Sequence, residues 1–176
     1  MIEKLPECRS VRVEFQEGWS QMAQKTLLAF ANTIGGDLYF GITDDGITKG
    51  LSKKAVNVIS RTVQEFCRSE VEPVLIDMVS TKVISAGNCT YVLRVTVDPG
   101  EDRPYALKGK RYTGGAYVRD GSMSVTATEE EIRDMIRDSS PQPWESRLSR
   151  QTDLRFGETA DIFKKYNVSF SSAHFL

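Results

Sequence analysis

The 176-residue chain has a single histidine, His174, and only three cysteines, Cys8, Cys67 and Cys89, which lie far apart in the sequence. One histidine excludes a histidine-rich metal centre and argues against a Ser-His-Asp catalytic triad. The cysteines are odd in number and form no Cys-x-x-Cys pair, which argues against a zinc site and favours free thiols in a reducing compartment. We therefore expect a cytoplasmic protein without a bound metal.

Long apolar runs and net charge are also lacking. No apolar stretch approaches the roughly 18 residues of a membrane-spanning helix, and the start of the chain shows no signal-peptide pattern. The formal net charge is only −1, so the molecule as a whole does not attract nucleic acid. Any nucleic-acid site must therefore be a local basic patch.

The segment from Leu27 to Gly50 predicts a helix, a strand and a turn in immediate succession. Apolar residues recur at three- and four-residue steps from 19 to 34, which predicts a buried helix face, and Gly35 is placed to end that helix. Residues 38–42 predict a strand covered on both faces, in which Gly41 indicates a close approach of other backbone or of a ligand. Residues 44–46, Asp-Asp-Gly, predict a turn that places two carboxylates at the strand's end.

The remaining pattern predicts an α+β fold: a mixed, largely antiparallel sheet of about six strands, with two helices on one face and a third, C-terminal helix. Whether residues 81–84 belong to a strand is left open. The expected elements are a half-buried strand at 10–15 with Glu14 on its polar face, a helix at 52–69 beginning at Ser52, a hairpin of strands 73–80 and 90–97, short strands at 105–107 and 116–119 around a turn at 113–115, and a helix from the capping box at Thr128 to about Asp138. We expect a domain over 1–140, with 141–176 as a linker and the start of a truncated C-terminal region.

Four short motifs resemble the Schlafen AlbA-type DNA-binding domain, which stands at the N-terminus of many bacterial proteins described as transcriptional regulators and in eukaryotic Schlafen proteins. The motifs are Val13-Glu14-Phe15-Gln16, Ala29 to Gly36, Gly41 to Gly46, and Tyr117-Val118-Arg119-Asp120-Gly121-Ser122. The resemblance implies a non-enzymatic module that binds nucleic acid, DNA more than RNA, at the front of a transcriptional regulator. Structural roles are expected for Asn32, which would cap the helix end with Thr33, and for Gly35, Gly36, Gly46 and Gly121.

The stretch from 103 to 119 is the candidate nucleic-acid surface, because it holds five cations and no acids. Cations contact phosphates, and tyrosines between them can stack on unpaired bases. The alternative is an exposed hairpin whose tyrosines belong to the core, and Arg119 could instead pair with Asp44 or Glu14 across the sheet. The candidate contacts are Arg103, Lys108, Lys110, Arg111, Tyr112 and Arg119.

A carboxylate cluster is the second candidate. Glu14, Asp44 and Asp45 could hold Mg²⁺ or Mn²⁺ for phosphodiester cleavage if their strands are neighbours. Some Schlafen proteins are described as ribonucleases with three acids, and by position the second and third fall on Glu14 and Asp44. The first falls on Arg9, a cation that repels a metal. We therefore rank a nuclease below a binding module.

Two further alternatives remain open. The family was once grouped with divergent ATPases, but the chain has no GxxxxGK[ST] motif, and the pair Gly35-Gly36 follows a helix where a phosphate loop would follow a strand. ATP binding is therefore weakly supported. A protein-interaction or dimerisation module, including a homodimer, is the other alternative.

Overall fold

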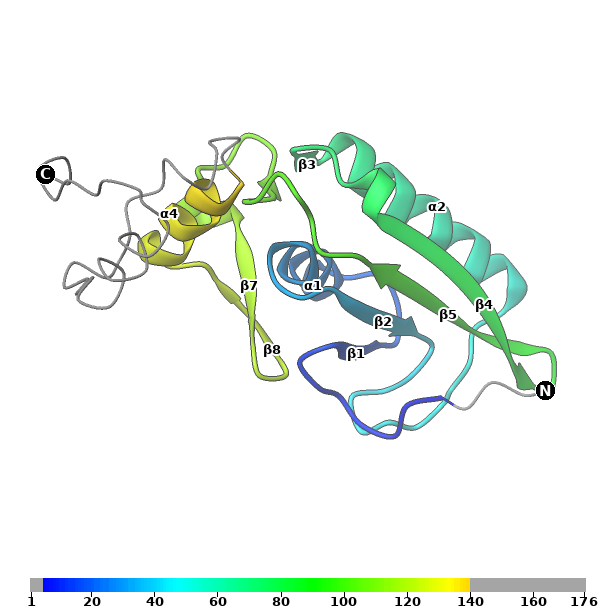
Figure 1. Cartoon of the computed structure of the whole chain (residues 1–176). Helices are drawn as coiled ribbons and strands as arrows, with labels where there is room; N and C mark the ends of the chain where they lie inside the picture. Colours follow the sequence, from blue (N-terminus) through cyan, green and yellow to red (C-terminus); the bar gives the residue numbers. More distant parts are fainter. Residues whose placement is uncertain (1–4, 140–176) are drawn as a thin grey trace, which may run out of the picture. The chain divides into compact units, whose positions relative to one another are not determined.

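The computed structural model describes residues 5–139, and the predicted linker region at 141–176 lies outside these residues. The described part is α+β, as predicted (Figure 1). Its elements are β1 (Val13–Gln16), α1 (Gln21–Asn32), β2 (Gly36–Phe40), α2 (Lys53–Ser69), β3 (Val71–Glu72), the 3-10 helix η1 (Ile76–Met78), β4 (Val79–Gly87), β5 (Thr90–Val97), β6 (Ala106–Leu107), α3 (Tyr112–Gly115), β7 (Tyr117–Asp120), β8 (Met123–Thr126) and α4 (Glu129–Asp138).

A four-stranded mixed sheet forms the centre, in the order β1-β2-β5-β4. β1 and β2 are parallel and α1 connects them, whereas β5 runs antiparallel to both of its neighbours. The predicted hairpin exists, but its first strand was misplaced. The first strand, β4, covers Val79–Gly87. Residues 81–84 therefore belong to this strand, and residues 73–78 do not. Asn88 and Cys89 form the turn with φ of 47° and 57°, both in the left-handed region that a tight hairpin turn requires.

β2 is covered on both faces, as predicted, whereas the edge strand β4 is largely exposed. α1 and α2 pack on one face, against apolar side chains of β2 and β5 that include Leu38, Phe40, Leu93 and Val95. Alternate residues point the other way, because successive side chains of a strand face opposite sides. These form a second cluster of Phe15, Tyr39, Ile42, Ile84 and Val92.

Three helices begin at side chains that accept a hydrogen bond from their own first turn. Ser20 and Ser52 accept from the N–H groups of Ala23 and Ala55 at the start of α1 and α2. At α4, Thr128 and Glu131 form the predicted capping box. Local capping thus fixes the starts of these helices, which is why the sequence predicted them closely.

The glycine pair after α1 is required by close packing. Gly35 has φ of 73° and donates its N–H to the Phe30 carbonyl at 3.0 Å, so it ends the helix as predicted. A Cβ on Gly36 would lie 2.5 Å from the Phe30 ring. The pair follows a helix and begins a strand, the reverse of the order in a phosphate loop.

The chain beyond β5 differs most from prediction. β6 pairs with β3, and β7 pairs with β8, a strand that the sequence did not indicate. Residues 112–115 form a short helix, α3, where a turn was predicted. The stretch from 103 to 119 keeps only part of the predicted hairpin. One antiparallel bridge joins Ala106 to Ala116, but β6 and β7 form their ladders with β3 and β8. No helix within residues 5–139 is long and apolar enough to cross a membrane.

Candidate nucleic-acid interface

Residues 108–112, which we name the basic loop, project from the short strand β6. Lys108, Lys110, Arg111 and Tyr112 are all exposed, and the segment contains no acid. Lys108 donates its backbone N–H to the Glu70 carbonyl at 2.8 Å, so the loop lies beside the C-terminal end of α2. The last three of these residues line a shallow hollow together with Glu72 of β3. The basic loop therefore presents three exposed cationic side chains and one exposed aromatic ring to an approaching anion.

Asn32 holds the segment that carries the basic loop. Its Nδ2 donates to the carbonyls of Tyr105 and Tyr117 at 2.8 and 2.9 Å, and its Oδ1 accepts from the Tyr105 N–H at 2.7 Å. The prediction that Asn32 caps its own helix was wrong, because its buried amide bonds to chain more than 70 residues away. Thr33 does bond locally, to the Ala29 carbonyl. Asn32 thus joins α1 to both ends of the 105–117 segment.

Arg119 is separated from the other candidate contacts by burial. Its side chain has 0% exposed surface, and its guanidinium lies 5.0 Å from the centre of the Phe30 ring. It donates to Glu14 at 3.0 Å and to the Ser10 carbonyl at 2.8 Å. A guanidinium in this position cannot reach a phosphate. The alternative that Arg119 pairs with Glu14 is therefore confirmed, and its place among the nucleic-acid contacts was wrong.

The alternation predicted that Glu14 lies on the polar, solvent-exposed face of its strand. That prediction was wrong, because Glu14 is buried. It is paired in register with Leu38, which faces the helices, so the carboxylate points into the layer between the sheet and β7. There it accepts from Arg119 and from the Phe15 N–H at 3.1 Å. The buried charge is thus matched by a buried cation and a backbone donor.

The rest of the 103–119 stretch is less exposed than the basic loop. Arg103 is half-buried, and Tyr105 and Tyr117 are buried. Burial raises the pKa of the Tyr105 hydroxyl above its ordinary value, so this ring is neutral. The reading of these two tyrosines as core residues is confirmed, and Tyr112 is the tyrosine of this stretch that solvent reaches.

The three candidate metal ligands do not form a cation site. Glu14 and Asp44 do approach each other, but Arg9 lies between them, with its Nη1 at 3.5 Å from Glu14 and 3.8 Å from Asp44. No group of three metal-ligating side chains exists within residues 5–139. A divalent cation here would meet a guanidinium in place of a third ligand, so these residues do not fit Mg²⁺ or Mn²⁺. Asp44 and Asp45 are exposed in the predicted turn.

The glycines of the motifs serve the backbone. Gly46 completes the turn after Asp44-Asp45 with φ of 82°, and Gly121 lies in the turn between β7 and β8 with φ of 56°. Gly41 has φ of 95°, and a Cβ there would lie 3.0 Å from Leu51 Cγ and 3.2 Å from the Tyr91 carbonyl oxygen. The predicted close approach of backbone at Gly41 is therefore present, together with one side chain.

The cysteines are free thiols, as predicted. Cys8 and Cys89 are exposed, and Cys67 of α2 is buried in the main core cluster. Burial raises the pKa of the Cys67 thiol to about 12, so it stays protonated at neutral pH and acts as a small apolar side chain.

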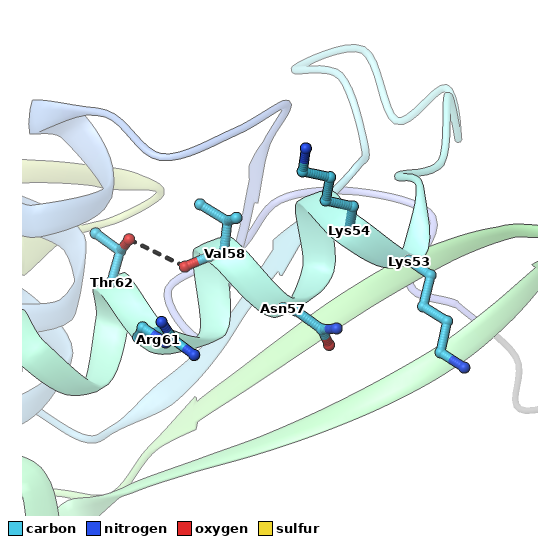
Figure 2. A pocket seen from close by; sticks show the side chains of 6 residues that line it. All are labelled: Lys53, Lys54, Asn57, Val58, Arg61 and Thr62. Atoms are coloured by element: carbon cyan, nitrogen blue, oxygen red, sulfur yellow. Dashed lines mark hydrogen bonds between the residues drawn. The ribbon is translucent and has the colours of Figure 1, made fainter.

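A second basic surface, which the sequence analysis did not single out, lies along α2. Figure 2 shows its outward side chains near the helix start, with Lys53, Lys54 and Arg61 extending into solvent around a hollow that Asn57, Val58 and Thr62 also line. Arg68 follows near the helix end. The signal was present: lysines and arginines recur on the side of the helix opposite to its apolar stripe.

The sequence profile described as Schlafen, AlbA_2 matches residues 10–128 of this chain. The match spans every element from β1 to β8, including Asn32, Glu14, Arg119 and the basic loop. No curated protein matches the chain. A match to this profile indicates a nucleic-acid-related function.

Proposed function

Because the chain belongs to the Schlafen AlbA_2 family, we propose that it binds nucleic acid, DNA in preference to RNA, through the basic loop, as a module of a transcriptional regulator. The observation that carries the proposal is the exposure of Lys108, Lys110 and Arg111 in a segment without acids. The chain as a whole carries a net charge of −1, so this concentration of positive charge is local. Local positive charge is what attracts a phosphate backbone.

The chemistry of the loop favours binding that depends little on base sequence. Lysine and arginine side chains on a loop contact phosphates, which fix position and carry no sequence information directly. Tyr112, with 41% of its surface exposed, can add a stacking contact to a base that is unpaired. The proposed contact set is therefore Lys108, Lys110, Arg111 and Tyr112, supported by Asn32 beneath them.

Replacing Lys108, Lys110 and Arg111 together with glutamine should weaken binding to DNA of any sequence. Each lost phosphate contact flattens the log-log salt dependence by about 0.9, so the triple variant should flatten it by about 2.7. Between about 50 and 200 mM salt, the affinity of the parent falls by some factor, and the affinity of the triple variant should fall by a factor about 40 times smaller. Fluorescence anisotropy with labelled DNA and RNA measures both quantities.

The matched control replaces three exposed cations elsewhere, Arg12, Lys49 and Arg133, with glutamine. It changes the net charge equally, so a general charge effect would appear in both variants. If the loop variant binds as tightly as the parent with an unchanged salt slope, the basic loop is not the site, and a protein-interaction module becomes the better account.

We also expect no metal-dependent cleavage, because Arg9 occupies the space between Glu14 and Asp44. Incubation of labelled RNA and single-stranded DNA with Mg²⁺ or Mn²⁺ should leave the substrates intact. Cleavage that Asp44→Asn abolishes would contradict this and promote the nuclease. Asp44 is the informative position, because its exposed side chain can be changed without disturbing the buried Glu14.

A further inference from the structure

The outward side of α2 is basic along its whole length. Its buried stripe of Val56, Ile59, Val63, Phe66 and Cys67 faces the core, and the opposite side carries four cations and one acid, Glu65. We name Lys53, Lys54, Asn57, Arg61, Gln64 and Arg68 the α2 face. All six side chains are exposed, and Arg61, Gln64 and Arg68 line a second hollow toward the helix end together with Glu65.

The cations of the α2 face are spaced for a long, straight ligand. Lys54, Arg61 and Arg68 follow one another at seven-residue steps. Each step is about two helical turns and advances about 10.5 Å along the helix axis. Seven residues return the side chain to within about 20° of the same direction, so the three form a row about 21 Å long. A rigid row of this length suits a rod of regularly spaced negative charge.

The first turn of α2 places its charges against the preference of the helix itself. Lys53 and Lys54 occupy the first two positions, and this turn contains no acid. Cations there are unfavourable, because the N-terminus of a helix already carries partial positive charge. An anionic partner that contacts the α2 face accounts for lysines where acids would stabilise the free protein.

The C-terminal end of the α2 face lies next to the basic loop, and the exposed acids Glu70 and Glu72 stand between the two sets of cations. α2 ends at Ser69, and the next residue, Glu70, accepts the Lys108 N–H at 2.8 Å. β3 then pairs with β6 directly before the loop, through Val71 and Leu107. The C-terminal end of the row at Arg68 therefore adjoins the basic loop within one compact unit of the chain (Figure 1).

The side chains between the cations distinguish a duplex from a single strand. Single-strand surfaces combine cations with aromatic rings on which bases stack. The α2 face has no aromatic residue, and Asn57, Val58 and Thr62 fill the space between its cations. A surface that has cations but no aromatic side chains suits the phosphate backbones of a duplex, whose bases are paired and stacked on each other.

We propose that the α2 face is a second phosphate-binding surface, which acts together with the adjoining basic loop on one molecule of double-stranded DNA. This rests on the proposed function and names its substrate as the duplex. Binding buries the row from Lys54 to Arg68 against the phosphates, while Lys108, Lys110 and Arg111 contact the same duplex beyond the end of α2.

The test compares the parent with the variant Lys54→Gln, Arg61→Gln, Arg68→Gln on a duplex of about 24 base pairs and on the matching single strand. The control is the Arg12, Lys49 and Arg133 triple described above. On the duplex, the α2 variant should flatten the log-log salt slope by about 2.7, and the control should leave it unchanged. On the single strand, the α2 variant should bind like the control. Circular dichroism melts confirm that each variant is folded.

The outcomes separate this inference from the proposed function. If the loop variant loses affinity and the α2 variant binds like the control, the α2 face does not bind DNA, and the basic loop alone is the site. Equal losses on duplex and single strand overturn the assignment to a duplex. Absence of binding by the parent to any nucleic acid overturns both proposals.

Discussion

Replacing Arg119 with methionine is expected to lower the free energy of unfolding by about 3–5 kcal/mol, because it leaves a buried carboxylate without its cation. The Arg119 and Glu14 side chains are 0% and 5% exposed, and their 3.0 Å contact joins β7 to β1. Methionine retains much of the apolar contact with Phe30 and removes the charge. Urea denaturation followed by circular dichroism measures the loss.

Two comparisons make the Arg119 result specific. Arg133→Met, on the exposed side of α4, should change stability by less than about 0.5 kcal/mol. Adding Glu14→Gln to Arg119→Met should recover part of the loss, since the unpaired charge is then gone. A fully stable Arg119→Met protein that binds DNA weakly would contradict the structural role and return Arg119 to the binding surface.

Asn32→Asp should be almost as damaging, although it changes one atom of the side chain. The amide nitrogen that donates to the carbonyls of Tyr105 and Tyr117 becomes an oxygen that repels them. Leaving two buried carbonyls without a donor costs about 2–5 kcal/mol. The 105–117 segment should loosen first, so amide hydrogen exchange should rise there while α2 remains protected.

Asn57→Asp is the matched control, because Asn57 is exposed on α2 and the chemical change is the same. It should leave stability nearly unchanged. If Asn32→Asp is as stable as the parent, with unchanged exchange in residues 105–117, then Asn32 does not hold the segment and the basic loop is supported in another way.

The parts of the fold that were predicted closely depend on local interactions. α2 and α4 begin at Ser52 and Thr128, where a side chain and the first turn of the same helix supply both bonding partners. Gly35 ends α1 because a single residue must adopt positive φ. Periodicity and caps are properties of neighbouring residues, so a single sequence displays them.

The parts that were predicted wrongly depend on distant partners. β6 and β3 have two residues each and lie about 35 positions apart, so neither shows a strand pattern of its own. Glu14 follows an alternation typical of a half-buried strand, but it is buried, because its carboxylate pairs with Arg119 of β7, a strand that packs against α1. Only tertiary packing decides which face of a strand is solvated.

The candidate site was predicted in part for the same reason. A cluster of cations is visible in a sequence, but their exposure is not, and the structure keeps Lys108, Lys110 and Arg111 at the surface while it buries Arg119. Asn32 resembled a helix cap because its partners, Tyr105 and Tyr117, lie far along the chain. The α2 face was overlooked because its cations alternate with apolar residues of the opposite side.

The most direct test of nucleic-acid binding is the salt dependence of the unmodified chain on a duplex of about 24 base pairs. With the basic loop and about three cations of the α2 face engaged, the log-log slope should be about −5. The affinity should therefore fall by about three orders of magnitude between about 50 and 200 mM salt. A slope shallower than about −1, or no binding at about 50 mM salt, would contradict the claim that these surfaces bind a phosphate backbone.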